Sequence, residues 1–225
     1  MVDYNNFAKK FAKSRKNMKW EEIDYFLEKI NKDEKLKILD IWCWSWRLLE
    51  QFSSDFDIEK IDYTWIDLSS WLLEEAKNSF PEKEFLELNM LDLDKINKKF
   101  NNIFFIASFH HLDNLKDREE VLDKAYNLLE EWWRIYMTNW ALNSKINNEK
   151  YKNSKLPHPN PLLTREGIEM NFWSTDYNIV FWKNNRYYHC FDLYELEYLA
   201  KNAWFKIIEN RLFDTEKNFI TILEK

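Results

Sequence analysis

Glycine and cysteine are both scarce in this sequence. The chain has 1 glycine in 225 residues, whereas ordinary usage of roughly 7% predicts about 16. Its two cysteines, Cys43 and Cys190, are too few for a disulfide framework and lack the spacing of metal ligands. No apolar run is as long as a membrane helix, and the N-terminus lacks the hydrophobic segment of a signal peptide. We therefore expect a soluble, cytoplasmic protein with reduced thiols, no metal site and no membrane contact.

Tryptophan, in contrast, is abundant, with 12 residues, and its placement is informative. In the stretch LKILDIWCWSWRLLE, residues 36–41 have the pattern of a buried strand, and a helix begins at Arg47. A tight turn from a strand into a helix is where α/β proteins bind nucleotides, and such a turn needs glycine. Here the turn holds Trp42, Trp44 and Trp46 instead.

Five more tryptophans occupy positions where glycine is expected. Trp132, Trp133 and Trp204 follow predicted helices, while Trp65 just before Asp67 and Trp71 at the start of the next helix hold close-approach positions of a nucleotide site. We interpret the gene as one that reads UGA as glycine, so that these eight tryptophans are glycine in the native protein. In the alternative interpretation the indoles are genuine. Since a tryptophan buries about 150–250 Å², three in one turn would then fill the cleft. Alternate residues of a short turn cannot all point inward, which argues against simple core aromatics.

Strands and helices alternate along the first two thirds of the sequence. The apolar runs predict strands over 36–41, 61–67, 85–88, 102–109 and 134–138, with helices from 47 and over 70–80 and 117–129. This alternation predicts a parallel, doubly wound α/β sheet with helices on both faces. After it come a helix over 193–202 and two apolar strands over 205–211 and 219–223, joined by a charged hairpin.

The length suits a single domain with a sizeable core. Within it we expect an N-terminal helical lid (1–35), a cofactor-binding half (36–139), a substrate-recognition insertion (140–190), and a terminal helix and strand pair (191–225). The pattern dissolves within this insertion, and structureless loops of such a size are usually functional. Its segment WKNNRYYHCF mixes cationic and aromatic side chains, which suits stacking a base and meeting an anion. An edge strand with solvated charges is the alternative.

The stretch around Asp40 resembles the first motif of class I S-adenosylmethionine (SAM)-dependent methyltransferases. Asp40, Cys43, Ser45 and Arg47 stand in register with that motif, and tryptophans replace its three glycines. The resemblance implies a Rossmann-like fold of seven strands, mostly parallel with an antiparallel terminal strand, and SAM as cofactor. It implies these cofactor-binding residues: Asp40, Trp42, Cys43, Trp44, Ser45, Trp46, Asp67, Leu68, Asn89, Met90 and Ala107. In it, Asp67 would accept hydrogen bonds from the ribose, Asn89 would bind the adenine amino group, and Met90 would pack on the ring.

Several elements, taken in order, resemble one branch of that family, the tRNA wobble-uridine carboxymethyl methyltransferases. They are Ser14, Arg15, Trp20, His110, His111, the segment NWAL at 139–142, the segment RYYHCF at 186–191, Glu195 and Leu196. The resemblance implies methyl transfer from a sulfonium to a carboxylate oxygen. A carboxylate is ionised at neutral pH and needs no strong base, so catalysis would rest on alignment and desolvation.

The candidate catalytic residues follow from that chemistry. Arg15 and Arg186 are the candidate cations for the carboxylate, and Tyr187 or Trp140 would sandwich the uracil. His110 is a further candidate. Adjacent histidines on a strand point to opposite sides, so we expect one to face the substrate and no metal site between the pair.

Three other readings stay open. The acidic composition favours a small-molecule O- or N-methyltransferase, since a free-standing tRNA enzyme benefits from positive potential. A nicotinamide dehydrogenase shares the strand, turn and acid but fits the insertion and terminal strands poorly. Genuine tryptophans would make a noncatalytic binding protein the leading hypothesis. The expected partners are accordingly tRNA or a small-molecule methyl acceptor, with a small activating subunit as a further candidate.

Overall fold

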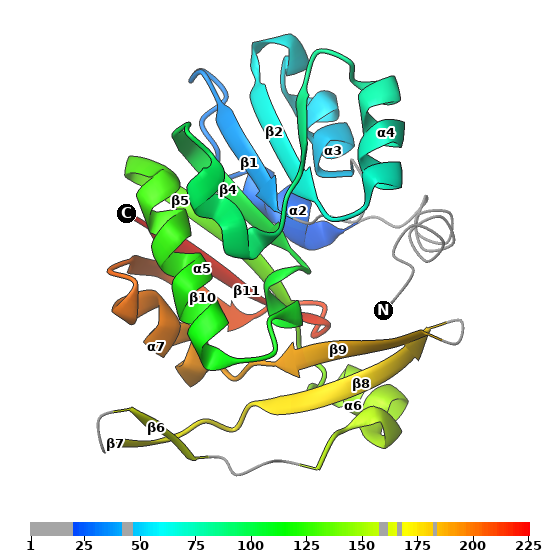
Figure 1. Ribbon diagram of the computed structural model, residues 1–225, viewed down its shortest axis with the longest axis vertical. Helices are drawn as coiled ribbons and strands as arrows, with labels where there is room; N and C mark the ends of the chain where they lie inside the picture. The colour runs from blue at the N-terminus through cyan, green and yellow to red at the C-terminus, as the bar shows by residue number, and fades with distance from the viewer. Residues whose placement is uncertain (1–19, 42–46, 158–161, 166–167, 182–183) are drawn as a thin grey trace.

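The computed structural model describes residues 20–41, 47–157, 162–165, 168–181 and 184–225. A seven-stranded sheet in the order β10-β11-β5-β4-β1-β2-β3 forms its centre (Figure 1). The strands are β1 (Lys37–Ile41), β2 (Asp62–Asp67), β3 (Glu84–Glu87), β4 (Phe100–Ile106), β5 (Leu129–Trp140), β10 (Lys206–Leu212) and β11 (Asn218–Glu224). β1 to β5 pair in parallel, whereas β11 is antiparallel to both of its neighbours. The expected Rossmann-like sheet with an antiparallel terminal strand is confirmed.

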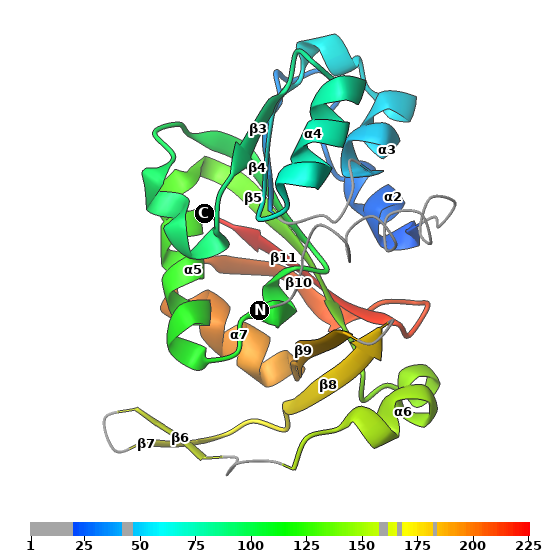
Figure 2. The same ribbon diagram turned by 45° about the vertical axis from the view of Figure 1, so that its right-hand side comes forward.

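Helices cover both faces of this sheet (Figure 2). On one face lie α2 (Glu21–Leu27), α3 (Arg47–Asp55) and α4 (Ser70–Ser79), and on the other lie α5 (Leu115–Leu128), α7 (Leu193–Asn202) and the 3₁₀ segment η2 (Met90–Lys95). β4 is buried along its whole length. Because side chains alternate along a strand, Phe105 joins the core on the α5 side while Phe104 joins the core on the α3 side.

Side-chain caps begin several of the helices. The side chains of Ser69, Asn114 and Asp192 accept hydrogen bonds from backbone N–H groups in the first turns of α4, α5 and α7. Such caps satisfy amides that have no partner inside the helix. They fix where each helix starts after its strand or loop.

α7 ends in a Schellman motif. The N–H of Phe205 donates to the carbonyl of Ala200 at 3.0 Å, and the N–H of Trp204 donates to the carbonyl of Lys201 at 3.1 Å. This motif requires a left-handed residue at the position after the cap, which is usually glycine. Trp204 holds that position with φ 65°.

The insertion between β5 and α7 is folded, so the expectation of a structureless loop is wrong for its described part. It contains α6 (Lys145–Tyr151), η4 (Lys152–Ser154), and the antiparallel pairs β6 (Leu162–Arg165) with β7 (Ile168–Asn171) and β8 (Thr175–Phe181) with β9 (Asn184–Cys190). The β8–β9 hairpin has a small core of its own around Tyr177 and Tyr188. Polar residues on its other face concealed this pattern in the sequence. The hairpin lies beyond the end of the main sheet (Figure 1).

Trp132 does not cap α5, contrary to the expectation from the sequence. The helix ends at Leu128, and Trp132 lies inside β5. Its backbone is nevertheless left-handed, with φ 69°.

No helix in the described part of the chain is long and apolar enough to cross a membrane.

Candidate active site

Two buried carboxyl groups lie toward the carboxyl ends of β1 and β2. Asp40 in β1 is fully buried, and the hydroxyl of Tyr63 donates a hydrogen bond of 2.5 Å to it. Asp67 ends β2, is 8% exposed, and accepts a hydrogen bond of 2.8 Å from the backbone N–H of Ser69. Burial raises the pKa of Asp67 to about 7, against the opposing effects of that hydrogen bond and of the positive charge of Arg186. Asp67 is therefore a buried acid with capacity to accept further hydrogen bonds.

Asn89 and Met90 follow β3 beside Asp67. The backbone N–H of Leu88 donates to the carbonyl of Asp67 at 3.1 Å, which joins the two strand ends. The side-chain oxygen of Asn89 accepts the N–H of Leu91 at 3.0 Å and caps η2. Met90 is buried in the core beneath that turn. The structure thus brings together an acid, an amide and an apolar side chain from adjacent strand ends.

The end of β4 has an unusual backbone. Ala107 has φ 52°, and its N–H donates to the hydroxyl of Thr138 at 2.9 Å and to the carbonyl of Thr138 at 3.1 Å. A left-handed residue other than glycine is uncommon, and such residues cluster at functional sites. Ser108 is fully buried, and its hydroxyl has no hydrogen-bond partner within the described residues.

His110 and His111 lie in a 3₁₀ turn, η3 (Phe109–His111), rather than on a strand. Their rings are 4.5 Å apart, and both contact Tyr188. The expectation that they point to opposite sides is therefore wrong, because a 3₁₀ turn does not alternate its side chains as a strand does. The described residues also contain no group of His, Cys, Asp and Glu suited to holding a metal ion.

The two histidines are neutral hydrogen-bonding groups. The N–H of Trp140 lies 3.2 Å from Nδ1 of His110, which assigns that nitrogen as an acceptor and leaves the proton on Nε2. Nδ1 of His111 lies 2.9 Å from the carbonyl oxygen of Tyr187, which assigns the proton of His111 to Nδ1. Burial, followed by the positive charge of Arg186, holds the pKa of both rings well below the usual value.

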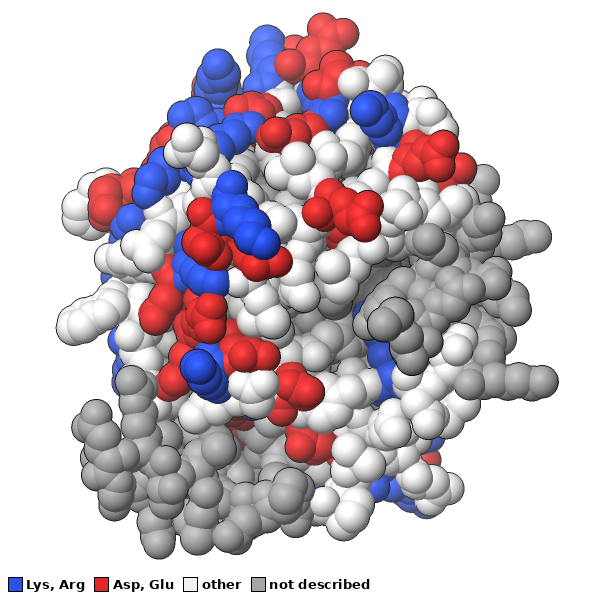
Figure 3. Space-filling model, viewed as in Figure 1, with Lys and Arg blue, Asp and Glu red and all other residues white. Residues whose placement is uncertain are grey.

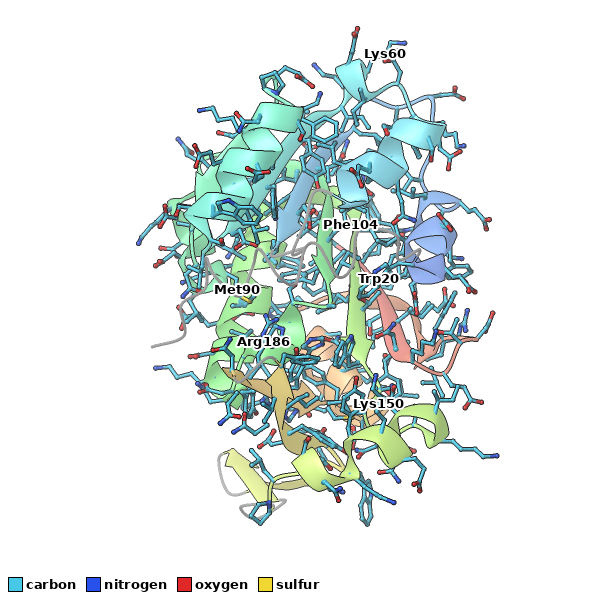
Figure 4. All side chains as sticks on the ribbon, turned by 90° about the vertical axis from the view of Figure 1, so that its right-hand side faces the viewer. Trp20, Lys60, Met90, Phe104, Lys150 and Arg186 are labelled. Carbon is cyan, nitrogen blue, oxygen red and sulfur yellow. The ribbon has the colours of Figure 1, made fainter. Side chains whose placement is uncertain are left out.

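The β8–β9 hairpin brings a cation and an aromatic ring close to the histidine turn. Tyr188 stacks on Trp140 with ring centroids 4.9 Å apart and planes 7° from parallel. The guanidinium carbon of Arg186 lies 5.7 Å from the Tyr188 ring centroid. Figure 4 shows Arg186 on the side of the hairpin that faces the sheet. Its charge also acts on the pKa of Asp67 and of His110.

The side chain of Tyr187 lies on the opposite face of the hairpin from Arg186 and Tyr188, because neighbouring side chains of a strand alternate. Its hydroxyl donates to Asp176 at 2.7 Å. Burial and that hydrogen bond raise the pKa of Tyr187 far above its usual value. The aromatic partner of Trp140 in the cleft is therefore Tyr188, which the sequence argument missed. The spacing in the sequence could have indicated this, since Arg186 and Tyr188 are two residues apart and therefore share one face of a strand.

A buried ion pair lies behind the hairpin. Arg118 of α5 and Glu195 of α7 are 3.0 Å apart and almost completely buried. Arg118 also donates two hydrogen bonds of 3.1 Å to the carbonyl of Leu112, just after the histidine turn. The hydroxyl of Ser174 donates to Glu195 as well. These contacts tie α5, α7 and the turn of His110 to the base of the hairpin.

His189 extends this network into the hairpin. Its Nδ1 lies 2.7 Å from Asp176 and its Nε2 lies 2.7 Å from Glu195. Burial alone would raise the pKa of both carboxyl groups, but the bonds to His189 and the charge of Arg118 keep each pKa below its usual value. His189 therefore joins Asp176 of β8 to Glu195 of α7.

Several predicted site residues lie outside the described residues. They are Arg15, Trp42, Cys43, Trp44, Ser45 and Trp46. The other predicted cofactor residues, Asp40, Asp67, Leu68, Asn89, Met90 and Ala107, all lie at or near the carboxyl ends of β1 to β4. In a doubly wound sheet, ligands bind at that edge, where the strand order reverses. Here the order reverses between β1 and β4.

Comparison with known proteins agrees with this geometry. Residues 39–131 match the model of a methyltransferase domain family. No curated protein matches the sequence. The fold is shared with a SAM-dependent methyltransferase from Clostridium acetobutylicum, at TM-score 0.67 and 17% identity over 99% of both chains.

Two further structures have the same fold. Streptomyces venezuelae DesVI has a TM-score of 0.64 and 15% identity, over 100% of this chain and 99% of the other. A Burkholderia thailandensis 1,6-didemethyltoxoflavin N1-methyltransferase, solved with S-adenosylhomocysteine, has a TM-score of 0.65 and 14% identity, over 100% and 84%. Residues 39–131 thus match a methyltransferase domain, and the solved structures share the fold of the chain.

Proposed function

We propose that this protein transfers the methyl group of SAM to the carboxymethyl group of a modified wobble uridine in tRNA. The observation that carries the proposal is the contact of Arg186 with a Trp140–Tyr188 stack, since its guanidinium carbon lies 5.7 Å from the Tyr188 ring centroid, while its charge also acts on the buried Asp67. A cation and a flat aromatic wall match the two parts of the acceptor, a carboxylate and a pyrimidine base.

The residues at the sheet edge fit the cofactor. Asp67 is buried with few donors, and the ribose hydroxyls would supply donors to it. The hydroxyl of Ser108, without a partner in the described part, adds a polar group that a ligand would satisfy. Asn89 and Met90 would hold the adenine ring and its amino group. When bound, SAM supplies a methyl group on a positively charged sulfur.

On the acceptor side, the protein would orient a group that is already a nucleophile. The acceptor carboxylate is ionised at neutral pH, so no base is required. Arg186 would hold one carboxylate oxygen while the Nε2 proton of His110 donates a hydrogen bond. The Trp140–Tyr188 wall would stack the base and exclude water, which leaves alignment and desolvation as the sources of rate.

Methyl incorporation tests this proposal. The chain is incubated with methyl-labelled SAM and either total tRNA from a strain that lacks the terminal methylation or a small-molecule extract. Label in tRNA that alkali releases as methanol, as expected of a methyl ester, supports the proposal. Label only in small molecules would overturn it in favour of the second candidate, a small-molecule O- or N-methyltransferase. The net charge of −6 favours that second candidate.

We further propose that eight tryptophans of the printed sequence are glycine in the native protein because its gene reads UGA as glycine. Trp132 and Trp204 have φ of 69° and 65°, a conformation that costs a residue other than glycine about 1–2 kcal/mol. Their side chains are 81% and 82% exposed, so packing does not offset that cost. The buried indole N–H of Trp65 has no partner among the described residues.

The same substitution would restore the turn after β1. Glycine at 42, 44 and 46 would let the main chain approach the cofactor closely, as the resemblance to the methyltransferase motif requires. Peptide mass spectrometry of the protein from its native host tests this. We expect glycine at Trp42, Trp44, Trp46 and Trp204 and tryptophan at Trp20. Tryptophan at all of these positions would overturn the proposal.

A further inference from the structure

The helix α6 and the turn η4 carry a concentration of positive charge. Residues 145–155 hold four lysines, at 145, 150, 152 and 155, and one glutamate, in a chain whose net charge is −6. All four lysine residues are exposed. Within α6 and η4 the structure gives one ion pair, Lys152 with Glu149 at 2.9 Å. We call these four lysines the α6 lysines.

Some lysines elsewhere on the protein pair with two acids each. Lys124 on α5 pairs with Asp94 and Glu120, and Lys98 pairs with Asp62 and Glu84. Figure 3 shows the result, since acidic and basic side chains are interspersed along α5, whereas basic side chains lie at the lower right, where Figure 1 places α6. The α6 lysines therefore form a local positive surface on an acidic protein.

This surface is fixed next to the candidate acceptor cleft. Tyr151 of α6 contacts Trp140 with ring centroids 5.9 Å apart, and the Lys150 ammonium lies 5.0 Å from the Tyr151 ring centroid. The side chain of Asn147 donates hydrogen bonds of 3.0 Å to the carbonyls of Ala141 and Lys217, which anchors the helix to β5 and β11. Lys155 forms a β-bridge with Tyr177 of the hairpin.

We propose that the α6 lysines bind the phosphate backbone of an RNA whose target nucleotide is held by Arg186 and the Trp140–Tyr188 stack. The inference rests on the proposed tRNA substrate and adds the surface that holds it. Phosphate contacts fix the register of a nucleic acid without reading its sequence, whereas stacking and the carboxylate contact select the nucleotide. The net negative charge of the protein repels RNA, and a positive surface beside the acceptor residues offsets that repulsion where the RNA binds.

The test compares two variants with equal loss of charge. The α6 variant is Lys145→Gln, Lys150→Gln, Lys152→Gln and Lys155→Gln; the control is Lys32→Gln, Lys35→Gln, Lys60→Gln and Lys77→Gln, also exposed. Figure 4 shows Lys60 at the top of the molecule, away from both Arg186 and Lys150. The probe is an anticodon stem-loop RNA with a carboxymethyl group on its wobble uridine. The affinity of each protein for this RNA is measured at salt concentrations from about 50 mM to about 300 mM.

We expect the α6 variant to bind the RNA roughly 10- to 100-fold more weakly at about 0.1 M salt, with a salt slope shallower by about 3. The control variant should match the unmodified chain, and all three proteins should bind SAM equally. Equal RNA affinity and slope in the α6 and control variants would overturn this surface. Absence of salt-dependent RNA binding by the unmodified chain would instead overturn the proposed tRNA substrate, so the two failures are distinguishable.

Discussion

The two sides of the cleft are held in place by different physical means. On the cofactor side, the strand ends of a parallel sheet place Asp67 and Asn89, with buried apolar cores on both faces. On the acceptor side, a two-stranded hairpin outside that sheet carries Arg186, and a buried network of charges anchors it. A site of this kind can keep its cofactor half unchanged while the hairpin and its anchors vary with the acceptor.

The largest effect is expected from removing Arg118. Arg118→Met would leave Glu195 buried without its cation, which costs about 3–5 kcal/mol. Arg134→Met removes a pair of similar length, 3.1 Å to Glu224, that is partly exposed, and should cost about 1 kcal/mol or less. Denaturant unfolding measures both. Equal losses would contradict the idea that burial makes the hairpin anchor different from a surface ion pair.

Asp67→Asn is expected to separate stability from binding. The folded-state pKa of Asp67 is raised from 3.8 to about 7, so this group lowers the stability of the ligand-free protein as pH rises from about 4 to about 7. At pH 8 the variant should be more stable by on the order of 2–4 kcal/mol, with little difference near pH 4.

The same variant should bind SAM roughly 10- to 100-fold more weakly, since its amide replaces an acceptor oxygen by a donor. Thermal unfolding and calorimetric titration give the two measurements. Tight SAM binding by Asp67→Asn would exclude Asp67 from the ribose site.

Arg186→Gln is expected to affect the acceptor side most. A charge-assisted hydrogen bond of about 1.5–3 kcal/mol corresponds to a loss of roughly 10- to 150-fold in kcat/KM for the acceptor. The Kd for SAM should change less than this, since the lost charge acts on SAM binding only through the pKa of Asp67. Arg211→Gln on β10, which removes a partly exposed pair with Glu209, serves as the control. A comparable loss in both variants would show that the Arg186 effect is not local.

The smallest effect concerns pH. The pKa of His110 and of His111 lies well below the usual value, so neither ring should titrate between pH 6 and 8. With both substrates saturating, kcat should vary by less than about threefold over that range. Affinity for SAM should fall below about pH 7 as Asp67 takes up a proton. A bell-shaped kcat profile centred in this range would show that a histidine acts as an acid or base.

The sequence predicted the main sheet better than the hairpin for a physical reason. β4 is a continuous buried run, and α7 has an N-cap and an apolar face, so both follow from local patterns. The hairpin is half polar, and its anchor joins Arg118 to Glu195, which are distant in the sequence. Pairings of that kind leave no local periodicity. The candidate cofactor residues were accessible because each lies at or near the carboxyl end of a strand, whereas Tyr188 required the register of β9.

If the gene reads UGA as glycine, as we propose, the Schellman end of α7 shows what one misassigned residue does to a structure. The ring of Trp204 lies in water, so a tryptophan there costs a little backbone energy and disturbs no neighbour. Three such rings after β1 would instead compete with a ligand for the same volume. A codon misassigned in this way would therefore leave the fold recognisable from the sequence, while the cofactor-binding turn would seem unable to bind its ligand.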